Sequence, residues 1–195
     1  MNSMHTAPPF NPCRSEAMPG VDDGLTSKSG RLPESTIPVG EYAPAFVLPR
    51  WDVGSFGFAE LLGTPTVLHF YPGSDTDWPQ QSAILADLSP KLGRFGVALV
   101  GIIAADRSAI SVHCKAESIT FPLLRDWEPR ALVSRLYGFN REKAAPAIAV
   151  TFLVDARGII RWISAENGYR TASGPEILGG VRAHLLRPSP VAHLN

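Results

Sequence analysis

The two cysteines are the residues of this chain best suited to nucleophilic chemistry, because a thiolate is a good nucleophile and metal ligand. Cys114 directly follows His113, and Cys13 lies between Pro12 and Arg14. Neighbouring residues do not face each other on a helix, so His113 is not expected to activate Cys114. We expect Cys114 to pack as a small apolar side chain and Cys13 to be an exposed thiol, and both stay candidate redox thiols.

Other reactive constellations do not occur in the sequence. The cysteines lack the C-x-x-C spacing of a dithiol or zinc site, and the histidines are scattered without metal-ligand spacing. No Gly-rich phosphate loop and no G-x-S-x-G turn is present. We therefore predict neither a metal site nor another cofactor, and neither nucleotide binding nor serine hydrolysis.

Charge and hydropathy give no sign of a nucleic acid or membrane partner. The 195 residues carry 18 Lys and Arg against 18 Asp and Glu, so no overall field would attract nucleic acid or an anionic membrane. The longest apolar run, Val97–Ala105, is about half the ~20 residues that span a bilayer. The low cysteine content suits a reducing cytoplasm, which is the predicted location. Six arginines are expected on solvated faces: Arg125, Arg130, Arg135, Arg141, Arg157 and Arg161.

The apolar pattern divides the chain into one domain and two tails. Residues 1–38 are rich in Pro, Ser, Gly, Asp and Thr and show no apolar period, which predicts a disordered tail. Residues 39–187 alternate strand-like and helix-like segments, and residues 188–195 form a short C-terminal tail. A domain of this length can bury one substantial core.

The order of the predicted elements indicates an α/β fold. Thr66–Tyr71 and Val97–Ala104 are predicted central strands buried on both faces, and Val150–Val154 with Ile159–Ile163 a hairpin. Asp77 is predicted to cap a helix that kinks or restarts at Pro90. Its predicted sheet-facing side chains are Ala83, Ile84, Leu85, Leu88, Leu92 and Phe95. Two further strands are predicted at Ala45–Leu48 and Thr120–Leu124. A short helix is predicted to end at Gly63, and three more helices are predicted at Ser108–Ser118, Pro129–Tyr137 and Pro175–Leu186. Together they predict a thioredoxin-like three-layer fold with a mixed sheet.

Four stretches carry a family resemblance: VGEYAPAFVLP, LHFYPGSDT, FPLLRDWEPRALVSRLYG and VTFLVDARGIIRW. Between Val39 and Trp162 they follow the order of the peroxiredoxins of the alkyl hydroperoxide reductase and thiol-specific antioxidant (AhpC/TSA) type, which the chain resembles. The resemblance implies a thioredoxin-like fold, a thiol-dependent peroxidase ancestry and a homodimer.

The chain departs from that family at both positions that matter most for its reaction. The family's catalytic turn reads Pro-x-x-x-Thr-x-x-Cys, and here Pro72 and Thr76 are kept while Pro79 replaces the cysteine. The family's activating arginine stands three residues before Phe152, where this chain has Ala149. Proline and alanine can neither attack nor polarise a peroxide, so we predict a protein without thiol peroxidase activity.

Two other interpretations stay open. Cys114 or Cys13 could serve as a relocated nucleophile of an antioxidant peroxidase. Alternatively, the chain could be a binding module, either for a small cationic or polar ligand in the vacated pocket or for a protein partner on the surfaces through which family members dimerise. The residues expected to form that pocket are Tyr71, Asp75, Asp77 and Trp78.

Overall fold

The computed structural model describes residues 37–71, 78–104, 107–117, 119–126, 132–138, 149–164 and 172–186. Cys13, most of the predicted N-terminal tail, the whole predicted C-terminal tail and the turn residues Pro72, Asp75, Thr76 and Asp77 lie outside these ranges. Ile37, which we expected in the N-terminal tail, packs against the core of the domain.

The described elements follow the predicted alternation of strands and helices. In chain order they are β1 (Val47–Pro49), β2 (Ser55–Gly57), the 3-10 helix η1 (Phe58–Leu61), β3 (Thr66–Phe70), α1 (Trp78–Gly93), β4 (Ala98–Ile103), α2 (Arg107–Glu117), β5 (Leu123–Arg125), α3 (Leu132–Leu136), β6 (Val150–Val154), β7 (Ile160–Ile163) and α4 (Gly174–His184).

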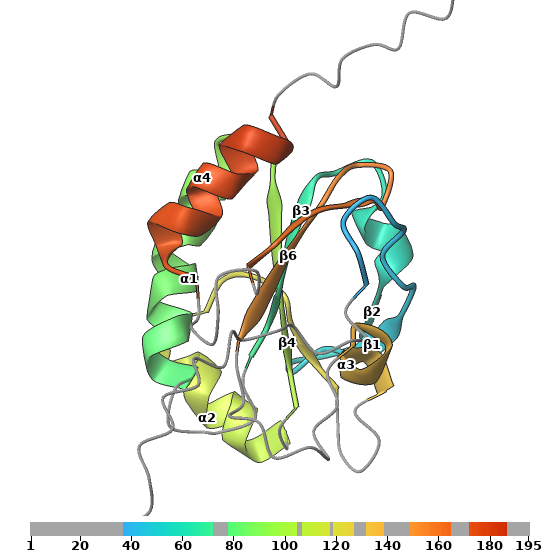
Figure 1. Cartoon of the computed structure of the whole chain (residues 1–195). Helices are drawn as coiled ribbons and strands as arrows, with labels where there is room; N and C mark the ends of the chain where they lie inside the picture. The colour runs from blue at the N-terminus through green and yellow to red at the C-terminus, as the bar shows by residue number, and fades with distance from the viewer. Residues whose placement is uncertain are drawn as a thin grey trace, which may run out of the picture.

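The central sheet has five strands in the order β5-β4-β3-β6-β7. The pairs β3–β4 and β4–β5 are parallel, whereas β6 is antiparallel to both β3 and β7. Helices α1, α2 and α4 cover one face, and α3 lies on the other face with η1 and the β1–β2 pair (Figure 1). The predicted three-layer fold with a mixed sheet is confirmed.

Strand β3 is buried along its whole length because both faces of the sheet are covered. Leu68 and Phe70 belong to a first core cluster with the aromatic side chains of the β1–β2 side, including Phe58. Val67 and Tyr71 belong to a second cluster, formed with α1, α2 and α4. The period of two along the strand therefore divides one apolar run between two cores.

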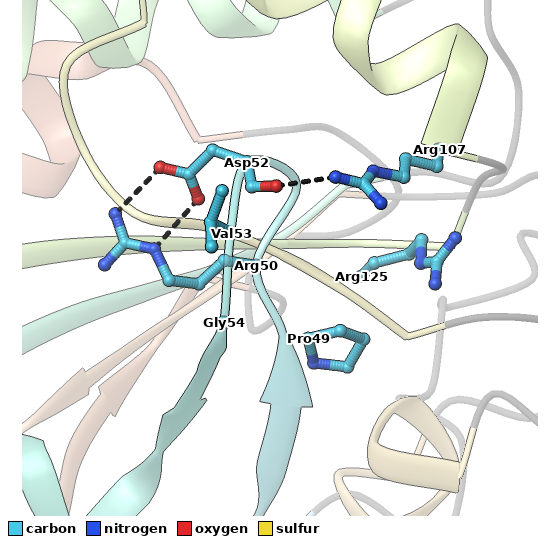
Figure 2. Close-up of a pocket in the computed structure, with 7 residues that line it drawn as sticks. All are labelled: Pro49, Arg50, Asp52, Val53, Gly54, Arg107 and Arg125. Carbon is cyan, nitrogen blue, oxygen red and sulfur yellow. Dashed lines mark hydrogen bonds and ion pairs between the residues drawn. The ribbon is translucent and has the colours of Figure 1, made fainter.

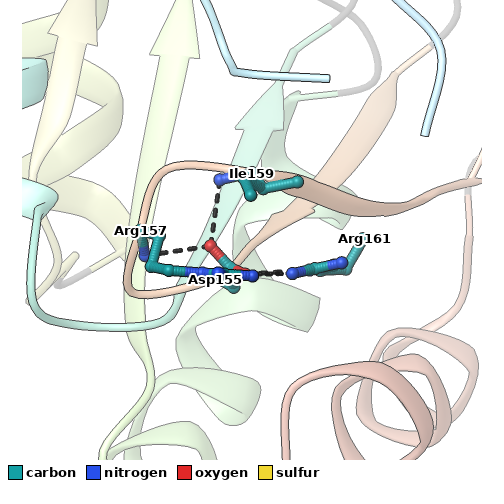
Figure 3. Close-up of polar contacts among 4 residues, drawn as sticks. All are labelled: Asp155, Arg157, Ile159 and Arg161. Atoms are coloured by element: carbon teal, nitrogen blue, oxygen red, sulfur yellow. Dashed lines mark hydrogen bonds and ion pairs between the residues drawn. The ribbon is translucent and has the colours of Figure 1, made fainter. Parts of the chain in front are cut away.

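The β6–β7 hairpin is fixed by one aspartate in its turn (Figure 3). Asp155 Oδ1 accepts hydrogen bonds from the backbone N–H groups of Arg157 at 2.9 Å and Ile159 at 3.0 Å. Asp155 Oδ2 accepts from the Arg161 guanidinium at 2.6 Å and 2.8 Å. Partial burial acts to raise the pKa of this carboxyl, but the hydrogen bonds outweigh burial and hold the pKa below its usual value.

Helix α1 differs from its prediction in three respects. It continues through Pro90 to Gly93 rather than restarting there. Ala83 is exposed, and Phe95 lies beyond the helix with 40% of its surface exposed. The Arg182 guanidinium lies 5.7 Å from the centre of the Phe95 ring. Leu85, Leu88 and Leu92 are buried as predicted, at the i, i+3 and i+7 spacing of an apolar stripe, and three further residues at the start of the helix are buried with them: Trp78, Gln81 and Ser82.

The remaining differences concern short elements. Strand β2, with three residues, was not predicted, and β1 begins two residues later than the predicted strand Ala45–Leu48 and includes Pro49. Pro49 is tolerated because the β1–β2 pair is separate from the main sheet.

Candidate functional site

Three chain segments meet at the edge of the sheet where β3 ends. Tyr71 follows β3, Trp78 begins α1, and Ala149 directly precedes β6. Because Val150 pairs with Phe70, Ala149 lies at the same end of the sheet as Tyr71. The structure thus brings together four of the residues singled out from the sequence: Tyr71, Trp78, Pro79 and Ala149.

The side chains at this edge are mostly buried. Tyr71 is 7% exposed, Trp78 3% and Ala149 2%, and all three belong to the core. Pro79, at the second position of α1, is exposed. Proline suits the first turn of a helix, where its missing N–H would have no intrahelical partner. The start of α1 therefore carries a conformationally suitable residue with neither a nucleophile nor a backbone donor.

Next to this edge, His69 is fully enclosed between β3, β6 and α1. Its Nδ1 lies 2.9 Å from Thr151 Oγ1 and its Nε2 lies 3.1 Å from Gln81 Oε1. Since an amide oxygen only accepts, Nε2 carries the proton and donates to Gln81, and Nδ1 accepts from the Thr151 hydroxyl. Burial lowers the pKa of His69 to about 4, against a smaller opposing effect of the Gln81 hydrogen bond. The imidazole is neutral at neutral pH.

A second hydrogen-bonded chain runs from the end of β3 to α2. Ser82 Oγ lies 3.0 Å from the Tyr71 hydroxyl and 2.6 Å from His113 Nε2. The Tyr71 ring is edge-on to the His69 ring, with ring centres 5.0 Å apart. The ring centres of Trp78 and His113 are 6.0 Å apart. Burial raises the pKa of Tyr71 far above its usual value, although the Ser82 hydrogen bond opposes this. The phenol is therefore protonated.

We refer to these side chains together as the buried polar network: His69, Tyr71, Gln81, Ser82, His113 and Thr151. Sequence reasoning did not find it. One signal was available, because a histidine within a strand buried on both faces needs hydrogen-bond partners. The partners could not be read from spacing, since Thr151 is 82 residues away from His69.

Cys114 packs on the second core cluster, as expected for a small apolar side chain, with 3% of its surface exposed. Burial, and to a smaller extent the negative charge of Asp52, raises the pKa of the Cys114 thiol to about 11. Its neighbour His113 is hydrogen-bonded to Ser82. Nothing in this environment favours a thiolate.

A pocket of about 220 Å³ opens where the β1–β2 loop, β5 and α2 meet. We call it the arginine pocket because Arg50, Arg107 and Arg125 line it together with Asp52 (Figure 2). The prediction that Arg125 lies on a solvated face is wrong, since its side chain is half-buried at the end of β5 and lines this pocket. The β1–β2 loop, which lies beside Arg125 in this pocket, comes from a distant part of the sequence.

Two other features are absent from the described residues: a metal-binding group of side chains and a membrane-spanning helix. Among them, no group of three or more His, Cys, Asp or Glu side chains could hold a metal ion. No helix in this part of the chain is long and apolar enough to cross a membrane.

Comparison with solved structures gives the class of the fold. BcpB of Mycobacterium tuberculosis, described as a peroxidoxin, superposes with a TM-score of 0.64 at 21% identity, over 77% of this chain and 98% of that one. AhpC of the same organism superposes with a TM-score of 0.64 at 21% identity, over 76% of this chain and 93% of that one. The domain has the thioredoxin-like fold of the peroxiredoxins.

Sequence comparison gives the family. The AhpC/TSA family profile matches residues 39–163. Alkyl hydroperoxide reductase E of M. tuberculosis is 35% identical over 126 residues, which are 64% of this chain and 82% of that protein. The chain belongs to the AhpC/TSA family, and the resemblance drawn from the four sequence motifs is confirmed.

Proposed function

We propose that this protein is a non-catalytic member of the AhpC/TSA family. The reaction of a thiol peroxidase requires a thiolate that attacks the O–O bond, forming a sulfenic acid and releasing water or an alcohol. The start of α1, where a partial positive charge would stabilise a thiolate, carries Trp78 and Pro79. Ala149, buried at the adjacent end of β6, has no group that could polarise a peroxide.

The observation that carries the proposal is the environment of Cys114, the single cysteine in the described ranges. A thiol with a pKa of about 11 is ionised to roughly one part in ten thousand at pH 7. Its 3% exposure also denies a peroxide access to the sulfur. Both properties argue against Cys114 as a relocated nucleophile.

The test is peroxide consumption by the full chain, with hydrogen peroxide and an alkyl hydroperoxide, and dithiothreitol or thioredoxin as reductant. We expect a rate no greater than that of free cysteine at the same concentration. The variants Cys114→Ser and Cys13→Ser are the matched controls, and neither should change the rate. Turnover above the free thiol rate that disappears in one of these variants would establish the relocated nucleophile instead.

A binding role in the vacated pocket has less support. Tyr71 and Trp78, two of the residues expected to line it, are buried and have partners within the core. Asp75 and Asp77 lie outside the described residues. This pocket, a homodimer, a protein partner and a cytoplasmic location stay predictions.

A further inference from the structure

Two buried histidines hold the start of helix α1 against the rest of the domain. Gln81 Oε1 lies 3.1 Å from Nε2 of His69 in β3. The next residue of the helix, Ser82, places its Oγ 2.6 Å from Nε2 of His113 in α2. We propose that protonation of His69 in mildly acidic solution releases the start of α1 from the sheet while the rest of the domain stays folded. This conformational switch does not depend on the absence of peroxidase activity.

The surroundings of His69 suit a neutral imidazole and not a protonated one. His69 is 1% exposed, and both of its hydrogen-bond partners, Gln81 Oε1 and Thr151 Oγ1, are uncharged. Protonation would make Nδ1 a donor, so the Thr151 hydroxyl would have to accept from it and redirect its own proton. It would also place a positive charge in the core, to which no carboxylate of the described residues is bonded. Because such a charge is costly, acid favours a conformation in which water reaches the ring.

The titratable groups on this side of the sheet do not supply the missing negative charge. Burial raises the pKa of Tyr71, whose ring contacts His69, and of Cys114 in α2, so both stay uncharged. His113 in α2 could add only positive charge. Glu176 in α4 is engaged in the cap of its own helix, where it accepts from a serine N–H and hydroxyl. Strands β4 and β6 place only uncharged residues opposite His69.

The start of α1 is the part of these surroundings that can move at the least cost. Strands β3 and β6 are interior strands of the central sheet, so displacing either would break pairing on both of its sides. At the start of α1, by contrast, Pro79 and Gln80 are already exposed, and the first N–H groups of a helix have no intrahelical partner. Lifting this turn would admit water to His69 and uncover Trp78, which is 3% exposed in the closed form.

Proton linkage gives the size of the expected effect. Burial lowers the pKa of His69 to about 4 in the closed form, whereas an exposed imidazole has a pKa of about 6.5. Between these values the open form binds a proton that the closed form does not. The ratio of open to closed molecules should therefore rise about twentyfold from pH 7 to pH 5 and be nearly constant above pH 7.

Amide hydrogen exchange of the full chain at pH 7, 6 and 5, corrected for the intrinsic exchange rate at each pH, measures this ratio residue by residue. We expect the Ser82 and Ala83 amides of α1 to open more often than the Val100 and Ile102 amides of β4 at every pH. Their opening constants should rise about twentyfold between pH 7 and pH 5. Equal constants in α1 and β4, or constants in α1 that do not change with pH, would overturn the proposal.

Three histidine variants test the assignment to His69. His69→Gln should remove the pH dependence, because an amide does not take up a proton in this range. His113→Gln should increase opening at every pH through the lost bond to Ser82 and keep the twentyfold rise. His184→Gln, at an exposed histidine of α4, is the matched control and should behave as the wild type. Loss of the rise in His113→Gln would overturn the assignment. If His69→Gln does not fold, the wild-type and His113→Gln exchange data decide the result.

Discussion

Two regions at the same edge of the central sheet have opposite physical character. The buried polar network lies between β3, β6, α1 and α2, and its six side chains are less than a tenth exposed. They hydrogen-bond to one another and enclose a neutral histidine. The arginine pocket at the ends of β4 and β5 is open, and charged side chains line it. The side chains of Arg50 and Asp52 are 35% and 40% exposed.

The contrast separates side chains that hold the scaffold together from side chains at its surface. Buried polar groups that are hydrogen-bonded within the core stabilise a fold but offer little to a ligand. Charged groups at the surface behave differently, because solvent screens them: an ion pair such as Arg50–Asp52 adds little to stability. Substitutions in the network should therefore lower the free energy of unfolding strongly, whereas substitutions of exposed side chains in the pocket should change it little.

The largest expected effect is from His69→Leu in the buried polar network. The leucine would fill much of the volume, but it would leave Gln81 Oε1 and the Thr151 hydroxyl without their histidine partner. Each such loss costs about 1–3 kcal/mol, so we expect the free energy of unfolding in urea to fall by about 3 kcal/mol. The control His184→Leu, at an exposed histidine of α4, should change it by less than about 0.5 kcal/mol. Equal effects of the two substitutions would refute a structural role for the network.

The second prediction concerns acid sensitivity. The pKa of His69 is lowered from 6.5 to about 4 in the folded state, so between these values the unfolded chain binds a proton that the folded chain does not. The contribution of neutral His69 to the free energy of unfolding is fully present above pH 6.5. It is lost as the pH falls toward 4, by up to about 1.4 kcal/mol per pH unit. Urea unfolding at pH 7, 6, 5 and 4 measures the slope. His69→Leu should flatten it over this window, and an unchanged slope in that variant would assign the acid sensitivity to other groups.

The third prediction tests how tightly the network is enclosed. A Cβ at Gly101 in β4 would lie 2.6 Å from Leu123 Cδ1 and 2.9 Å from Tyr71 Cε2, both closer than van der Waals contact. Gly101→Ala should therefore lower the free energy of unfolding by about 1–3 kcal/mol, the usual cost of overpacking. Gly93→Ala is the control, because nothing lies within 4 Å of its added Cβ. Thermal melting of both variants compares them, and a Gly101→Ala protein as stable as Gly93→Ala would show that the neighbours move aside at little cost.

The sequence predicted those parts of the fold that depend on local pattern. Thr66–Phe70 was recognised because burial on both faces leaves a continuous apolar run, and the hairpin because Asp155 and Gly158 form a turn between two such runs. The candidate site was predictable only where a family pattern marks its positions, as at Pro79 and Ala149.

The rest depends on contacts between distant segments, which spacing does not encode. Arg125 lines a pocket because the loop at Trp51 is hydrogen-bonded to Leu123, about seventy residues away in the chain. The hydrogen bond that joins Ser82 to His113 likewise requires α1 and α2 to pack side by side. Neither contact leaves a local signature, so Arg125 was expected to be solvated and the network was not expected.

The smallest expected effect on stability is from Arg107→Gln in the arginine pocket. Arg107 is exposed, and its bond to the Asp52 carbonyl is at the surface, where such contacts contribute about 0–1 kcal/mol. We expect the free energy of unfolding to change by less than about 0.5 kcal/mol. Urea unfolding of Arg107→Gln and of the wild type measures this difference. A loss of stability as large as that from His69→Leu would mean that the pocket holds the fold together as the network does, and the distinction between the two regions would fail.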